Sequence, residues 1–91
     1  MLDIHRSTQF KKDLKKIIKQ GKNLRLLEEI VDLLCNGKLL PEKNSDHALV
    51  GNWKGYRECH INPDWLLIYK IEDEVSLLRL IRTGSHSDLF K

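Results

Sequence analysis

One stretch decides the fold of this chain: His60-Ile61-Asn62-Pro63-Asp64-Trp65-Leu66-Leu67-Ile68-Tyr69-Lys70. Its Asn-Pro-Asp sequence favours a tight turn, because proline fixes φ and the flanking side chains can bond to their own backbone. Residues 65–71, after the turn, are apolar at both alternating sets of positions, which is typical of a strand covered on both faces. We therefore predict a hairpin whose second strand lies centrally in a sheet. The turn also gathers an imidazole (His60), a carboxylate (Asp64) and a large ring (Trp65), which a packed hairpin does not require.

The chain before this hairpin has the pattern of a strand followed by two helices. Residues 2–5 alternate weakly and predict a short strand, after which Ser7 or Thr8 can cap a helix. Gly21 is suited to end that helix, and a second helix is predicted from about residue 23 to residue 36. The apolar stripe of the first helix consists of Phe10, Leu14, Ile17 and Ile18. The short link between the helices predicts an antiparallel helical hairpin.

Three strands are predicted in the second half of the chain, at residues 53–61, 65–71 and 75–83. Glu72-Asp73-Glu74 is predicted to form an acidic hairpin tip between the last two. The order of one strand, two helices and then three strands indicates an α+β fold, with a twisted antiparallel sheet and both helices on one of its faces. A chain of 91 residues is expected to fold as a single domain, residues 1–91.

Composition places the chain among ordinary globular proteins, with 41% hydrophobic and 32% charged residues. Its apolar runs are too short to span a bilayer, and its N-terminus lacks the basic-then-apolar order of a secretory signal. Cys35 and Cys59 are too few for a disulfide framework and lie in apolar segments, so we expect buried free thiols. These features predict a cytoplasmic protein that makes no membrane contact.

The net charge of +3 is unevenly distributed, because one short segment is rich in lysine. That segment, opposed only by Asp13, contains Lys11, Lys12, Lys15, Lys16, Lys19 and Lys22. A polyanionic partner such as RNA or DNA is one interpretation. A solvated helix face is the other, and taken alone the lysine run favours it.

Residues able to do chemistry concentrate in the second half of the chain. His47, His60 and His86 each lie beside turn or loop residues, and Arg82 ends the last predicted strand. No pair of histidines has the HExxH or short HxH spacing of a common zinc site, and there is no GxSxG sequence or glycine-rich phosphate loop. Imidazoles transfer protons near neutral pH, arginine neutralises developing phosphate charge, and aromatic rings stack on unpaired bases. This inventory suits metal-independent cleavage of RNA by its own 2′-OH, although each histidine alone is more simply a solvated loop residue and Trp53 a core residue.

Four segments with matching order and spacing resemble one known family. They are Asp46-His47-Ala48-Leu49; Gly51-Asn52-Trp53-Lys54-Gly55-Tyr56-Arg57; His60-Ile61-Asn62-Pro63-Asp64-Trp65 with Leu67-Ile68-Tyr69; and Arg82-Thr83-Gly84-Ser85-His86-Ser87-Asp88-Leu89-Phe90. The chain is similar along nearly its whole length to YafQ-type toxins of the RelE/ParE superfamily. Members of that family are bacterial toxins, each encoded with an antitoxin, that cleave messenger RNA in the ribosomal A site without a metal.

The resemblance implies a role for each matching residue. His86 would be the general acid, and His60 or Asp64 would act on the 2′-OH proton while the other orients it. Arg82 would stabilise the transition state, and His47 would contact the scissile phosphate or support the acid and base. Residues that would contact RNA are Trp65, Phe90, Lys11, Lys12, Lys15 and Lys16.

The resemblance also implies the partners. These are a cognate antitoxin protein, the ribosome and its messenger RNA, while no cofactor is expected and the free toxin would be a monomer. Two alternatives belong to other functional classes. One is a ParE-like toxin that acts on DNA gyrase without cutting nucleic acid, and the other is a non-catalytic RNA-binding module that keeps the fold. The His, Asp and Arg set favours the ribonuclease over both.

Overall fold

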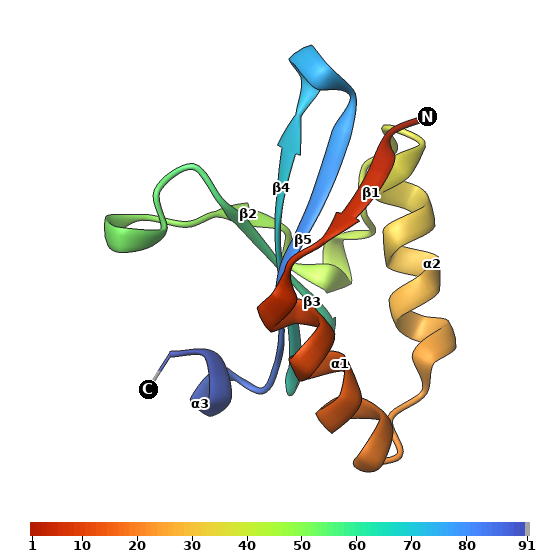
Figure 1. Ribbon diagram of the computed structural model, residues 1–91, viewed down its shortest axis with the longest axis vertical. Helices are drawn as coiled ribbons and strands as arrows, with labels where there is room; N and C mark the ends of the chain where they lie inside the picture. The colour runs from red at the N-terminus through yellow and green to blue at the C-terminus, as the bar shows by residue number, and fades with distance from the viewer. Residues whose placement is uncertain (91) are drawn as a thin grey trace.

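The computed structural model describes residues 1–90, in which two long helices and a sheet form the body of the molecule (Figure 1). The helices are α1 (Thr8–Lys19), α2 (Leu24–Cys35) and the short α3 (His86–Leu89). The strands are β1 (Asp3–Arg6), β2 (His47–Ala48), β3 (Arg57–Asn62), β4 (Trp65–Glu72) and β5 (Leu77–Gly84). Single 3-10 turns occur at Glu42–Asn44, Gly51–Trp53 and Asp73–Val75.

The predicted helical hairpin is confirmed, and local signals explain its boundaries. Ser7, rather than Thr8, caps α1 by accepting a hydrogen bond from the backbone N–H of Phe10, and Asn23 caps α2 in the same way through Arg25. Gly21 follows the end of α1 with φ of 74°, a conformation that costs glycine little. The two predicted long helices therefore begin and end within a few residues of their predicted boundaries.

The sheet has five strands in the order β1-β5-β4-β3-β2. The pairings of β3 with β4 and of β4 with β5 are antiparallel, as predicted, and so is that of β2 with β3. Strand β1, however, runs parallel to β5, so the sheet is mixed rather than antiparallel. A parallel pair requires a long connection, and here most of the chain lies between its two strands. The pairing of β1 with β5 depends on residues more than 70 positions apart in sequence, as in the pair Asp3 and Leu77.

Two strands begin later than predicted, and two short elements were not predicted at all. Strand β5 begins at Leu77 rather than at Val75, because Asp73–Val75 forms a 3-10 turn. Strand β3 begins at Arg57 rather than at Trp53, because Gly51–Trp53 forms a 3-10 turn and Gly55 adopts φ of 96°. Strand β2 and helix α3 were not predicted, since each is too short to show a periodic pattern.

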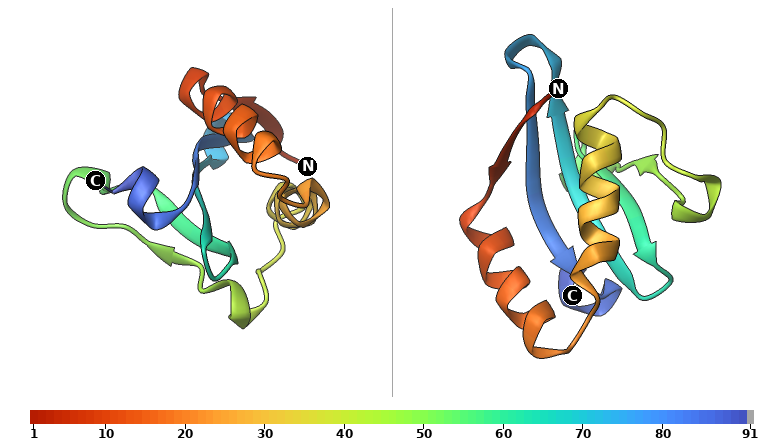
Figure 2. Two further views of the ribbon diagram at one scale, coloured as in Figure 1. Left: turned by 90° about the horizontal axis from the view of Figure 1, so that it is seen from below. Right: turned by 90° about the vertical axis from the view of Figure 1, so that its right-hand side faces the viewer.

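Both faces of the central strand are covered, as its apolar sequence predicted. One core lies between the sheet and the two long helices; Figure 2 shows α2 crossing the sheet and α1 beside the end of β5. On this side β4 contributes Trp65, Leu67 and Tyr69. On the opposite face Leu66 and Ile68 pack with Leu89 of α3 and with the segment between β2 and β3. The helices thus cover one face, while short, irregular segments cover the other.

Two further predictions concern the cysteines and the membrane. Both Cys35 and Cys59 are buried free thiols, as expected. None of the helices within residues 1–90 combines the length and the apolar character that crossing a membrane requires.

Candidate active site

A row of cross-strand neighbours places two of the polar candidates, His47 and Arg82, on the face of the sheet away from α1 and α2. The register pairs His47 with Glu58, Glu58 with Ile68, and Ile68 with Arg82, so one row crosses β2, β3, β4 and β5. Directly opposed residues of antiparallel strands point to the same face. His60, two residues after Glu58, projects from that face in the next row.

Glu58 lies between two of the predicted catalytic histidines. Its Oε1 atom is 3.7 Å from His47 Nε2 and 3.6 Å from His60 Nε2, and the residue is only 5% exposed. His47 Nδ1 lies 2.7 Å from the carbonyl oxygen of Ser45, which can only accept, so Nδ1 carries a hydrogen. Glu58 is therefore placed to form an ion pair with either ring when that ring is protonated. Sequence reasoning missed Glu58, although its alternation with Cys59 along β3 was a signal that it shares a face with His60.

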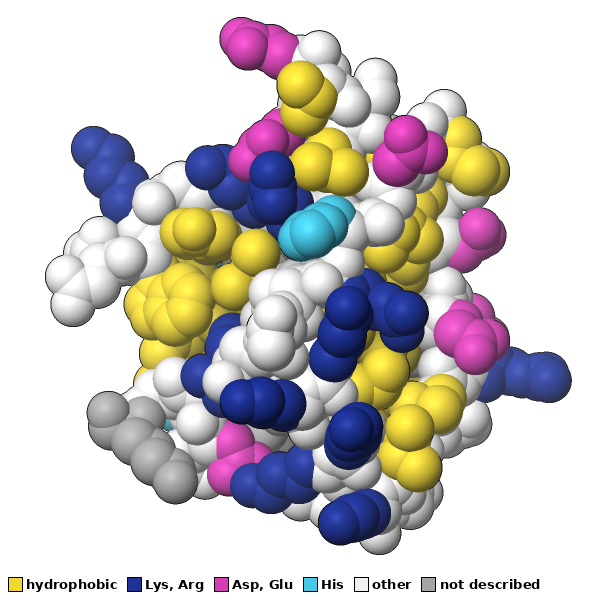
Figure 3. Space-filling view, in the orientation of Figure 1, with side chains coloured by type: hydrophobic (Ala, Val, Ile, Leu, Met, Phe, Trp, Pro, Cys, Tyr) yellow, Lys and Arg dark blue, Asp and Glu magenta, His cyan; other side chains and the backbone are white. Residues whose placement is uncertain are grey.

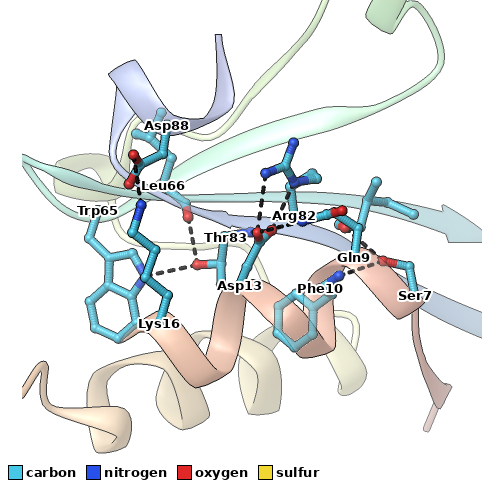
Figure 4. Close-up of polar contacts among 11 residues, drawn as sticks. Ser7, Gln9, Phe10, Asp13, Lys16, Trp65, Leu66, Arg82, Thr83 and Asp88 are labelled. Atoms are coloured by element: carbon cyan, nitrogen blue, oxygen red, sulfur yellow. Dashed lines mark hydrogen bonds and ion pairs between the residues drawn. The ribbon is translucent and has the colours of Figure 1, made fainter. Parts of the chain in front are cut away.

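Arg82 is held by a carboxylate from α1. Its Nε and Nη2 atoms donate to the two oxygens of Asp13 at 2.8 and 3.1 Å (Figure 4). This contact with Asp13 raises the pKa of the Arg82 guanidinium, because it stabilises the charged form. The sequence indicated Arg82 but not Asp13, which was noted only as the acidic exception in a lysine-rich segment.

His86 is the first residue of α3 and is exposed. Ser85 caps this helix by accepting a hydrogen bond from the N–H of Asp88, and Asp88 in turn pairs with Lys16 of α1 at 3.0 Å. That ion pair lowers the pKa of Asp88, since the ammonium of Lys16 favours the carboxylate. The ring of His86 lies against that of Phe90, with centroids 5.0 Å apart, so these two candidates form one aromatic unit.

Asp64 lies at the exposed tip of the hairpin between β3 and β4, where its N–H bonds to Asn62. Strand pairing of His60 with Leu66, and of Leu66 with Gly84, brings this end of the hairpin level with the end of β5 that leads into α3. The structure thus brings His47 and His60 together around Glu58. It places Arg82 in the same cross-strand row as Glu58. His86 and Asp64 lie at the end of the sheet where β3 turns into β4 and β5 leads into α3.

The prediction that Trp65 stacks on RNA is wrong for this structure. Trp65 is 0% exposed, packs in the core beneath the helices, and donates from Nε1 to the hydroxyl of Thr83 at 2.8 Å. A ring enclosed by core residues presents no face to a nucleotide. Trp53, interpreted as a core residue, is half-buried: it packs against the smaller core and contacts Tyr56 and Phe90 edge to face. Trp53 contacts the candidate residue Phe90 and is partly exposed, whereas Trp65 is enclosed in the core.

The lysine-rich segment lies on α1, except for Lys22, which follows the end of the helix. Lys11, Lys12 and Lys15 are exposed there, while Lys16 makes the ion pair with Asp88. Lysine and arginine side chains gather over this helix in the lower part of the space-filling view (Figure 3). This surface is basic and solvated, so the structure is compatible with both interpretations of the lysine run.

Comparison with known proteins defines the class of molecule. A family model described as "Bacterial toxin of type II toxin-antitoxin system, YafQ" matches residues 2–91. A relative from Escherichia coli (strain K12), named mRNA interferase toxin YafQ, is 48% identical over 89 residues, which are 97% of this chain and 95% of that protein. The chain therefore belongs to the YafQ family of toxins from type II toxin–antitoxin systems.

Solved structures agree with this assignment. The E. coli DinJ–YafQ complex contains a chain that is 46% identical, with full coverage of both chains and a TM-score of 0.90. A metal-bound toxin from Helicobacter pylori is 47% identical over 99% of this chain and 100% of that one, with a TM-score of 0.94. Among residues 1–90 of the present chain, no three His, Cys, Asp or Glu side chains are arranged to hold a metal ion, so we assign no metal ligands here.

Proposed function

We propose that this toxin is an mRNA interferase, an endoribonuclease that cuts messenger RNA in the ribosomal A site by attack of the RNA's own 2′-OH. The observation that carries the proposal is the buried carboxylate of Glu58 between His47 and His60, in the same cross-strand row as Arg82. The name of the E. coli relative supports the substrate class. Action on translating ribosomes would place the protein in the cytoplasm.

The reaction requires a base, a cation and an acid. The base takes the 2′-OH proton, the 2′ oxygen bonds to phosphorus, and the bond to the 5′ oxygen breaks as that oxygen receives a proton from the acid. The products are a 2′,3′-cyclic phosphate and a 5′-OH. The geometry favours His60 over Asp64 as the base, because Glu58 lies 3.6 Å from His60 Nε2 and would stabilise the imidazolium that forms.

The other roles follow from position and chemistry. His86 is the general acid in this proposal, exposed on α3 where a leaving 5′ oxygen can approach it. Arg82 balances the charge that develops on the phosphorane, and His47 supports the phosphate or the proton-transfer pair. Phe90, beside His86, is the residue best placed to hold a nucleotide. The lysines of α1 contact ribosomal phosphates in this proposal.

A cognate antitoxin is the second partner that we propose. The E. coli family member forms a complex with DinJ. A small protein with an acidic or partly disordered segment would complement the basic face of the present toxin.

The mechanism is tested with a messenger RNA that carries one 2′-deoxy nucleotide at the mapped cut site. Translating ribosomes are incubated with toxin and either this RNA or its all-ribose counterpart. We expect cleavage of the ribose RNA, with a cyclic phosphate or its 3′-phosphate product, and no cleavage of the deoxy RNA despite nearly equal binding. Cleavage of the deoxy RNA at an undiminished rate would show that water is the nucleophile. If neither RNA were cleaved, the proposal that the protein is a ribonuclease would be rejected.

A further inference from the structure

We propose that Asp13 is a positioning residue for the reaction, one that acts by fixing the guanidinium of Arg82 from the opposite side of the sheet edge. The inference rests on the proposed function, in which Arg82 balances the charge of the transition state. Asp13 itself belongs to a helix whose other charged residues are all lysines, and nothing in its sequence context marks it as functional.

The carboxylate of Asp13 is fully engaged, and every donor to it comes from α1 or from the end of β5. Oδ2 accepts from Arg82 Nε at 2.8 Å and from the backbone N–H of Thr83 at 3.1 Å. Oδ1 accepts from Arg82 Nη2 at 3.1 Å and from Gln9 Nε2 at 3.0 Å. Figure 4 shows the carboxylate between Gln9, Arg82 and Thr83. The backbone contact fixes the carboxylate relative to the strand, and the side-on contact with Arg82 then fixes the guanidinium.

Local backbone geometry explains why a residue on α1 reaches Arg82. The pairing of β4 with β5 is irregular at this point, because Ile68 opposes Arg82 while the next residue, Tyr69, opposes Leu80. An extra residue in one strand of a pair changes the direction of the neighbouring side chains. Strand β1 pairs with β5 only as far as Leu80, and Ser7 at the start of α1 then donates to the carbonyl oxygen of Ile81 at 2.7 Å. Helix α1 thus takes the place of a neighbouring strand beside Arg82.

The pair leaves Arg82 able to bind an anion. Within residues 1–90, Asp13 is bound to Nε and one hydrogen of Nη2, and no other residue accepts from this guanidinium, so Nη1 and the other Nη2 hydrogen remain for a phosphate oxygen. The Arg82 side chain is 24% exposed, whereas that of Asp13 is only 10% exposed. The buried carboxylate therefore restrains the arginine without screening it from substrate. Restraint of this kind lowers the entropy that Arg82 loses when it binds the transition state.

Thr83 connects the pair of Asp13 and Arg82 to the core of the protein. Its N–H donates to Asp13, and its hydroxyl accepts from Trp65 Nε1 and donates to the carbonyl oxygen of Leu66 at 2.8 Å. Buried hydrogen bonds through Thr83 thus connect Asp13 to Trp65 and Leu66 of the central strand β4. This explains a structural use for Trp65, which the resemblance assigned to RNA contact.

A double-mutant cycle separates positioning from a purely structural role. Asp13→Asn keeps the shape of the side chain but removes its charge, and Arg82→Lys keeps a cation but cannot make the side-on pair. We expect Asp13→Asn to lower kcat about 10- to 100-fold with little change in KM, because a misplaced catalytic group costs rate rather than binding. In the Arg82→Lys background the same substitution should change kcat less than about 2-fold, since coupled residues are not additive.

The matched control is Glu72→Gln, which breaks another arginine–carboxylate pair of the sheet, Glu72 with Arg79 at 2.9 Å, far from the candidate residues in register. It should leave kcat unchanged. If Asp13→Asn does not fold, Asp13→Glu, which keeps the charge but moves the carboxylate, goes through the same cycle. Wild-type kcat in the folded Asp13 variant, or an equal loss in both arginine backgrounds, would overturn the inference alone. A wild-type protein that cuts no RNA would overturn the proposed function and the inference with it.

Discussion

At the scale of single residues, two buried carboxylates lie against the basic side chains of the candidate site. Glu58 faces His47 and His60, and Asp13 faces Arg82. Each carboxylate is buried while its partners are more exposed, so each is placed to orient the groups that contact RNA in the proposed reaction. A carboxylate that orients an imidazole and stabilises its protonated form is a common way to make a histidine an effective base.

Glu58→Gln should lower kcat at least about 10-fold, because the amide cannot stabilise the imidazolium of His60 when it takes a proton. The amide is nearly the same size, so thermal unfolding should change little. Single-turnover cleavage on programmed ribosomes measures the effect, with the exposed Glu74→Gln as control. Full activity of Glu58→Gln would reject Glu58 as a partner of the base and leave Asp64 as the alternative.

The sequence alone identified the histidines and Arg82 as candidate site residues, because imidazole and guanidinium groups are suited to proton transfer and phosphate binding. Glu58 and Asp13 could not, since their roles depend on which side chains the register and the packing of α1 bring to them. The error over Trp65 has the same origin. An exposed turn precedes it, but its ring is enclosed by residues that are distant in sequence, including Thr83, its hydrogen-bond partner.

At the scale of secondary-structure elements, α1 is the organising helix. Ser7 at its start bonds to β5, Asp13 in its middle holds Arg82, and Lys16 pairs with Asp88 of α3. The two long helices were predictable because caps and apolar spacing are local. The parallel pairing of β1 with β5, the two-residue β2 and the four-residue α3 were not, because they depend on contacts made only in the folded chain.

Acid should weaken the tie between α1 and α3. The pKa of Asp88 is lowered in the folded protein by Lys16 and by Ser85, so the unfolded chain binds a proton more readily. The resulting stabilisation is present above the ordinary pKa of 3.8 and is lost as pH falls through the lower, folded value. We expect wild-type stability to fall more steeply than that of Lys16→Ala between about pH 5 and about pH 2.

Urea unfolding at several pH values measures that difference, and an NMR titration of Asp88 should show its pKa rising in Lys16→Ala. Lys19→Ala, an exposed lysine in the last turn of the same helix, is the control for helix charge. Parallel stability profiles for wild type and Lys16→Ala would mean that the ion pair makes no contribution in solution.

At the scale of the whole molecule, the two faces of the sheet differ: one holds the larger core and the other the candidate site. The face beneath α1 and α2 holds the larger core, including Trp65 and Tyr69 of β4. The other face carries the row of His47, Glu58 and Arg82 beside a smaller cluster around Leu89. Because β4 contributes residues to both cores, the face that carries the candidate site is supported directly by the most buried strand of the molecule.

The reactivity of the Cys59 thiol measures how often strand β3 and its neighbours open to solvent. It is 0% exposed, and burial raises the pKa of its thiol to about 12, with the charges of Asp46 and Glu58 adding to the effect. Since thiolate is the reactive form, alkylation near pH 8 should require opening of the sheet. We expect Cys59 in a Cys35→Ala variant to react with iodoacetamide at the intrinsic alkylation rate multiplied by the unfolded fraction, which is extrapolated from urea experiments.

An antitoxin that binds only the folded toxin should slow this reaction further, in proportion to its concentration above its Kd, because binding lowers the unfolded population. A short unfolded peptide containing cysteine gives the intrinsic alkylation rate. Rapid labelling of the folded toxin, at a rate independent of urea at low concentrations, would indicate local opening of β3. In that case Glu58 and His60, which flank Cys59, would not be held rigidly in the free toxin. The labelling rate therefore tests whether the candidate site is organised before RNA arrives.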